Sequence, residues 1–66
     1  MLTFNDWAGQ QVAYRLVPAE PDADEKVVCE IDPHGTGEWT SFGRGKTNSA
    51  ALKSATEAWN DYDRQH

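Results

Sequence analysis

The longest hydrophobic pattern of the chain lies near its C-terminal end and has the period of an α-helix. Apolar residues recur there at spacings of one, three and four: Ala51, Leu52, Ala55, Ala58, Trp59 and Tyr62. These spacings place all six side chains on one face of a helix. Thr47, Asn48 and Ser49 are each good N-cap residues. We therefore predict a helix from about Asn48 to Asp63 that packs on the rest of the chain.

Two segments upstream alternate between apolar and polar positions, as strands with one buried face do. They are Gln11–Val17 and Lys26–Asp32. The positions expected to face the core are all apolar or aromatic: Val12, Tyr14, Leu16, Val27, Cys29 and Ile31. Cys29 is therefore expected to be a small buried hydrophobic residue and not a nucleophile.

A third, shorter strand is predicted over Glu38–Phe42, after the turn-forming residues 32–37. Its large residues, Trp39 and Phe42, are three positions apart, which breaks strict alternation. This spacing predicts a bulge or a bend before Gly43.

The N-terminal segment Leu2–Gly9 is predicted to be a short helix. Thr3 is a plausible N-cap with Asp6 three residues on, close to a capping box, and Leu2 and Trp7 fit a hydrophobic staple. The expected order is helix, strand, strand, strand, helix. This is an α+β domain of two layers, in which a three-stranded antiparallel sheet packs against a short N-terminal helix and a long C-terminal helix.

The length of 66 residues allows a single domain, 1–66, with a small core. One cysteine rules out an internal disulfide, and the chain has no hydrophobic leader and no apolar run of membrane-spanning length. We expect a cytoplasmic protein that contacts no membrane, encoded by a complete small reading frame or trimmed from a longer one. Both a monomer and a homodimer stay open, because the edges of a three-stranded sheet invite pairing.

The net charge of −5 is concentrated in the first half of the chain. Residues 18–25, which we call the acidic loop, hold two prolines and four acidic residues and must be exposed. Acidic proteins are repelled by nucleic acid and suit a basic protein partner, although the acids also serve solubility. The acidic residues predicted to face such a partner are Glu20, Asp22, Asp24, Glu25, Glu30 and Asp32.

The order of elements, with Gly-x-Gly-x-Thr before an alanine-rich helix, resembles the double-stranded-RNA-binding domain. The residues that match this family at its spacing are Gly43, Gly45, Thr47, Ala51 and Ala55. The family's phosphate-gripping lysines, however, fall on Asn48, Ser49 and Leu52, and its minor-groove loop falls on residues 21–24, where a carboxylate repels phosphate. The resemblance therefore implies the scaffold without the RNA contacts. The alternative is a weak double-stranded-RNA binder that uses Arg44, Lys46 and Lys53.

Residue patterns typical of catalysis or metal binding are incomplete. Lys46 and Thr47 follow Gly45 as in a P-loop, but Thr40 stands where that motif needs its first glycine. One cysteine and two histidines do not supply a four-ligand metal site. We expect no catalytic site, metal or cofactor, and hence no enzyme.

In size and charge the chain is similar to small phage-encoded inhibitors such as anti-CRISPR proteins, which implies a non-enzymatic role through protein–protein interaction.

Overall fold

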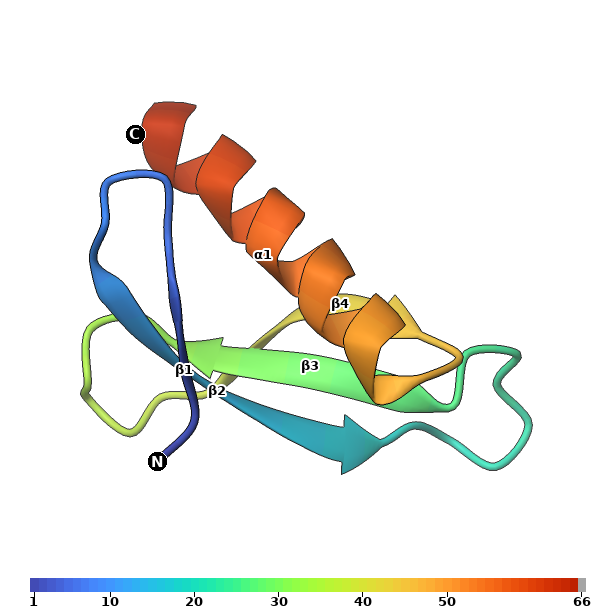
Figure 1. Cartoon of the computed structure of the whole chain (residues 1–66). Coiled ribbons are helices and arrows are strands. Elements are labelled where there is room, and N and C mark those ends of the chain that lie inside the picture. The colour runs from blue at the N-terminus through green and yellow to red at the C-terminus, as the bar shows by residue number, and fades with distance from the viewer. Residues whose placement is uncertain (66) are drawn as a thin grey trace.

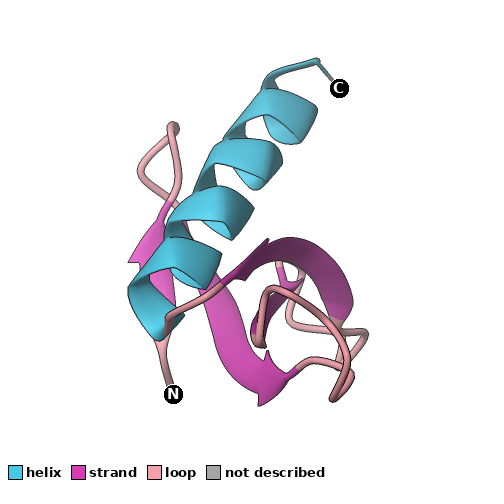
Figure 2. Cartoon of the chain, turned by 90° about the vertical axis from the view of Figure 1, so that its right-hand side faces the viewer, coloured by secondary structure: helices cyan, strands magenta, loops and turns pink. Residues whose placement is uncertain are grey.

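The structure, a computed structural model, describes residues 1–65. Within them, four strands precede one helix: β1 (Thr3–Asn5), β2 (Gln11–Pro18), β3 (Val27–Asp32), β4 (Thr40–Gly45) and α1 (Asn48–Gln65). The strands lie side by side in chain order, and every neighbouring pair is antiparallel. Helix α1 crosses one face of this sheet (Figure 1, Figure 2). The predicted α+β class is therefore confirmed.

The N-terminal helix predicted over Leu2–Gly9 is wrong, and so is the count of three strands. Residues Thr3–Asn5 form β1, which pairs with β2 so that Phe4 lies opposite Val12. Eight residues do not hold a helix in water on their own, and pairing with β2 gives this segment the partner that it needs. The sheet therefore has four strands, and α1 is the only helix in residues 1–65.

Asp6 explains why the capping signals of this segment were misleading. Its Oδ1 accepts hydrogen bonds from the amides of Ala8 and Gln10, each at 2.9 Å. Gly9, between them, has a φ of 78°, which glycine adopts without strain. The carboxylate therefore closes a turn between β1 and β2. An aspartate with amides in reach stabilises turns as well as helix starts, so the local pattern does not separate the two.

Strands β2 and β3 confirm the predicted core face, although Val28 and Asp32, which the alternation placed on the other face, are also buried. Val12, Cys29 and Ile31 are buried in the core, and Cys29 and Ile31 are completely inaccessible to solvent. Tyr14 and Leu16 are partly buried and pack against this cluster. The face of the sheet predicted to be apolar is therefore the one that α1 covers.

Strand β4 begins two residues later than predicted, and its predicted bulge is confirmed. Glu30 of β3 lies opposite Ser41, whereas Cys29 lies opposite Gly43. Phe42 is therefore the extra residue of the bulge. Its ring packs against the core cluster.

Helix α1 packs closely on β4 because both surfaces carry small residues. A Cβ atom placed on Gly43 would lie 2.2 Å from the backbone nitrogen of Ala55, and one on Gly45 would lie 2.5 Å from that of Ala51. Both distances are far below van der Waals contact, so only glycine fits at either position. The Gly-x-Gly motif therefore serves packing of the helix on the strand.

The observed bounds of α1 agree with the predicted helix. It begins at Asn48, as predicted, and ends two residues beyond the predicted end at Asp63. Thr47 is the N-cap, since its Oγ1 accepts a hydrogen bond from the Ala50 amide at 3.2 Å. Within residues 1–65, no helix combines the length and the apolar character that a membrane crossing requires.

Candidate binding surfaces

The acidic loop connects β2 to β3 and is braced by its own hydrogen bonds. The Ala19 amide donates to the Lys26 carbonyl at 2.9 Å, which closes the base of the loop, and the Ala23 amide donates to the Glu20 carbonyl at 3.0 Å. The Lys26 ammonium donates to the Pro21 carbonyl at 3.0 Å. The loop is therefore an ordered projection at the end of the sheet near the start of α1 (Figure 1).

Glu20 differs from the other acids of the loop because its side chain forms an ion pair. Its carboxylate accepts a hydrogen bond from the Arg44 guanidinium at 3.1 Å. This bond lowers the pKa of Glu20 and raises the pKa of Arg44. A residue predicted to bind protein and one predicted to bind RNA thus neutralise each other.

The three remaining acids of the loop are Asp22, Asp24 and Glu25, which we call the acidic tip. All three are exposed to solvent. Their carboxylates take part in none of the ion pairs among the described residues. The acidic tip therefore carries three negative charges that none of the described ion pairs neutralises.

Glu30 belongs to a different surface, the face of the sheet opposite α1. It lies directly across from Arg15 on β2, and the two side chains form an ion pair at 2.6 Å. The Arg15 guanidinium also lies 4.6 Å from the centroid of the Trp39 ring. The Arg15 guanidinium therefore contacts both the Glu30 carboxylate and the Trp39 ring, an arrangement that combines an ion pair with a cation–π contact.

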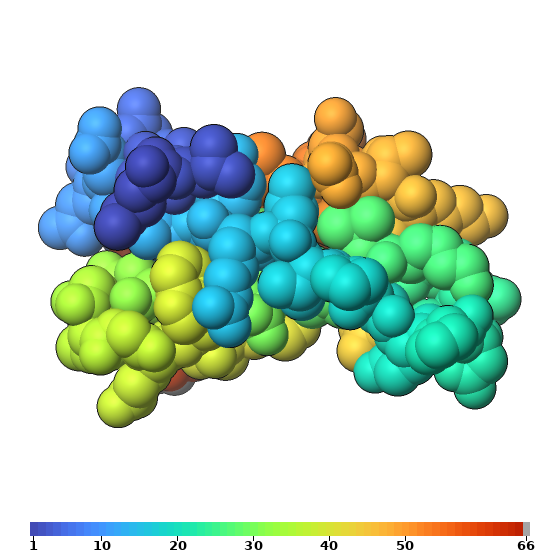
Figure 3. Space-filling view, turned by 90° about the horizontal axis from the view of Figure 1, so that it is seen from below, coloured from blue at the N-terminus to red at the C-terminus, as the bar shows by residue number. Residues whose placement is uncertain are grey.

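Asp32 stabilises the turn that follows β3. It is only 7% exposed, and its two oxygens accept hydrogen bonds from the Thr36 amide at 3.1 Å and the Gly37 amide at 2.9 Å. This turn lies at the opposite end of β3 from the acidic loop. Figure 3, which views the molecule from the strand side, shows the two loops at opposite ends (acidic loop in teal, β3–β4 loop in yellow-green). Of the six predicted acids, the structure thus groups only those of the loop.

The two lysines predicted for RNA binding lie near the start of α1. Lys46 follows β4 and Lys53 lies in the second turn of the helix, and both are exposed. Arg44, the third residue of that prediction, is on β4 and engaged by Glu20. Of the three residues predicted to bind RNA, Arg44 is thus engaged by Glu20, and Lys46 and Lys53 remain.

The turn between β1 and β2 fixes the position of the C-terminal half of α1. Oδ2 of Asp6 accepts a hydrogen bond from the Trp59 indole at 3.3 Å. The Trp7 amide donates to the Asn60 side chain at 3.0 Å, and the Trp7 indole donates to Asp63 at 3.1 Å. Burial alone would raise the pKa of Asp6, but the bonds from the Gln10 amide, the Trp59 indole and the Ala8 amide outweigh it, so the pKa is lowered.

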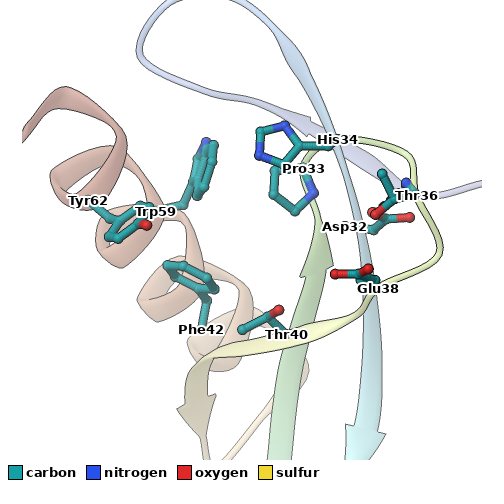
Figure 4. Close-up of a pocket in the computed structure, with 9 residues that line it drawn as sticks. All are labelled: Asp32, Pro33, His34, Thr36, Glu38, Thr40, Phe42, Trp59 and Tyr62. Carbon is teal, nitrogen blue, oxygen red and sulfur yellow. Dashed lines mark hydrogen bonds between the residues drawn. The ribbon is translucent and has the colours of Figure 1, made fainter. Parts of the chain in front are cut away.

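A cleft of about 360 Å³ opens between the β3–β4 loop and the C-terminal half of α1. We call it the aromatic cleft. Figure 4 shows the rings of Phe42, Trp59 and Tyr62 on one side and the carboxylates of Asp32 and Glu38 on the other. The cleft therefore has one aromatic wall and, facing it, one wall with negatively charged carboxylates.

The aromatic wall is a single cluster of rings. The Phe42 ring lies edge-on to Trp59 and to Tyr62, with centroids 5.7 and 5.9 Å apart, and Trp59 and Tyr62 are 6.0 Å apart. His34 approaches Trp59 edge-on at 6.5 Å. Trp59 is 5% exposed, whereas Tyr62 is 49% exposed, so the cluster extends from the core to the surface.

Sequence reasoning missed this cleft because it assigned Trp59 and Tyr62 together to the apolar face of the helix. Their spacing of three residues is compatible with a core position for both. The bulge at Phe42 is the one available signal, since it re-aims a large ring toward the helix next to a turn.

No group of three or more potential metal ligands gathers anywhere in the described part of the chain. No family model, curated protein or solved structure compared with the chain matches it.

Proposed function

We propose that this chain is a small acidic protein without enzymatic activity that binds a basic surface of another protein. The acidic tip makes the central contact. In its specific form, the proposal is that this basic surface normally binds nucleic acid and that the chain acts as an inhibitor by covering it, in the manner of phage-encoded anti-CRISPR proteins.

The arrangement of the acidic loop is the observation that carries this proposal. Three carboxylates are exposed at the tip of a loop whose own hydrogen bonds hold it in place. Because the loop is already ordered, little conformational entropy is lost when a partner binds it. Clustered charge of one sign also steers a partner of opposite sign and increases the association rate.

The start of α1 supports the same choice over direct RNA binding. Arg44 is paired with Glu20, and the charge of Glu25 also contributes to the raised pKa of Arg44. A phosphate backbone that approaches Arg44 therefore meets the charges of two carboxylates. Carboxylates oppose the counterion release that supplies most of the affinity for nucleic acid.

Affinity capture from a lysate of the native host, quantified by mass spectrometry, tests the proposal. Two matched double variants are compared with the wild type: Asp22→Lys with Asp24→Lys, and Glu57→Lys with Asp61→Lys. Each changes the net charge of −5 by the same amount, but only the first alters the acidic tip. Circular dichroism confirms that both variants are folded.

We expect the protein captured by the wild type to be lost with the loop variant and retained with the helix variant. If both variants still capture the protein, the acidic tip does not make the contact. If both lose it to the same extent, the partner responds to net charge alone, and the role assigned to the acidic tip is again wrong. Titration of a short RNA duplex at low salt addresses the alternative. Binding that weakens with added salt and is lost in Lys46→Glu would favour RNA as the ligand.

A further inference from the structure

We propose that the aromatic cleft binds the guanidinium group of an arginine side chain from another protein. This site lies at the opposite end of β3 from the acidic tip and does not depend on it. The inference adds a second recognition site to the molecule.

The two walls of the cleft suit the two properties of a guanidinium group. Its flat faces stack on aromatic rings, and its edge donates paired hydrogen bonds to carboxylates. Phe42 and Tyr62 supply partly exposed rings on one wall, and Glu38 supplies an exposed carboxylate on the other (Figure 4). Asp32 adds negative charge, although its oxygens already accept hydrogen bonds from two backbone amides.

The same chain shows this recognition on its own arginine. The Arg15 guanidinium lies over the Trp39 ring and pairs with Glu30. The aromatic cleft has the corresponding ring and carboxylate, and no lysine or arginine of residues 1–65 lines it. Among the described residues, His34 is the one basic side chain that lines the cleft. An arginine of a second protein would complete the arrangement.

An apolar or anionic occupant fits the cleft less well. An apolar side chain would bury the Glu38 carboxylate without a partner, which is costly. An anion would be repelled by the carboxylates of Asp32 and Glu38, which line the cleft. A lysine ammonium can pair with Glu38, but it is more strongly hydrated than guanidinium and stacks less well on the rings.

Titration of ¹⁵N-labelled protein with N-acetyl-arginine amide tests the inference by nuclear magnetic resonance. We expect saturable shifts of the Trp59 indole signal and of the Thr36–Glu38 amides. N-acetyl-citrulline amide, which has the shape of arginine without its charge, is the matched control, and N-acetyl-lysine amide separates guanidinium from ammonium. No partner protein is needed, so failure here is distinct from failure of the acidic tip to bind.

Two single substitutions locate the binding. Glu38→Gln is expected to weaken arginine binding about threefold, the range of an exposed ion pair. Glu57→Gln removes the same charge from the outside of α1 and is expected to leave binding unchanged. Equal shifts with citrulline, lysine binding as tight as arginine binding, or equal weakening by the two substitutions would each overturn the assignment.

Discussion

Replacing Gly43 with alanine is expected to separate α1 from β4. The added Cβ would lie 2.2 Å from the backbone nitrogen of Ala55, 2.7 Å from its Cα and 2.8 Å from the carbonyl oxygen of Ala51. Ordinary contact begins at 3.4 Å, and backbone atoms of a helix cannot rotate away as a side-chain end can. The helix as a whole must therefore move outward by about 1 Å, since close-packed interiors do not absorb an extra methyl group.

The cost is large for a domain of this size. Overpacking typically costs about 1–3 kcal/mol, and here the displaced helix also loses contact with the core, so we expect a loss at the upper end, about 3 kcal/mol. A chain of 66 residues has a free energy of unfolding of about 3–10 kcal/mol. The melting temperature should therefore fall by about 12 °C or more.

Thermal and urea denaturation followed by circular dichroism measure this effect. Ser41→Ala, an exposed substitution on the same strand, is the control and should change the free energy of unfolding by under about 0.5 kcal/mol. A further test adds Ala55→Gly to Gly43→Ala. Because the clash is with backbone atoms, removing the Ala55 methyl group should not restore stability. A Gly43→Ala protein as stable as the control, or rescue by Ala55→Gly, would refute the reasoning.

Two further predictions concern ionisable groups of the fold. The pKa of Asp6 is lowered in the folded protein, so its contribution to stability is complete above the ordinary value of 3.8 and is lost as the pH falls through the folded value. Asp6→Asn should therefore reduce the loss in melting temperature between pH 7 and about pH 3, and an unchanged loss would contradict this. Burial, and secondarily the charge of Glu30, raises the pKa of the Cys29 thiol. Cys29 should therefore react with a disulfide reagent at least about tenfold more slowly in buffer than in urea, and equal rates would contradict its burial.

Strands β2 and β3 and helix α1 were predictable because each has a long stretch of one hydrophobic period. The N-terminal segment was not, since Asp6 has the same local neighbours in a helix cap and in a turn. What distinguishes the two states is a set of distant partners: residues Thr3–Asn5 pair with β2, and Asp6 accepts a hydrogen bond from Trp59, 53 residues away in the chain. A local pattern contains no information on such a partner.

The candidate surfaces were predictable to a similar extent. The acidic loop was evident from its prolines and acids, because composition alone requires that such a segment be exposed. The pairing of Glu20 with Arg44 and of Glu30 with Arg15 was not, since both depend on which strands are neighbours. The aromatic cleft depends on the bulge at Phe42 and on a turn placed beside the end of α1.

Hydrogen–deuterium exchange of the chain, free and in complex with the captured partner, tests the central proposal most directly. If the acidic tip makes the contact, the amides of residues 19–26 should exchange more slowly in the complex, while those of residues 46–50 at the start of α1 should be unaffected. Exchange in residues 19–26 that is the same in the free and bound chain would contradict the proposal.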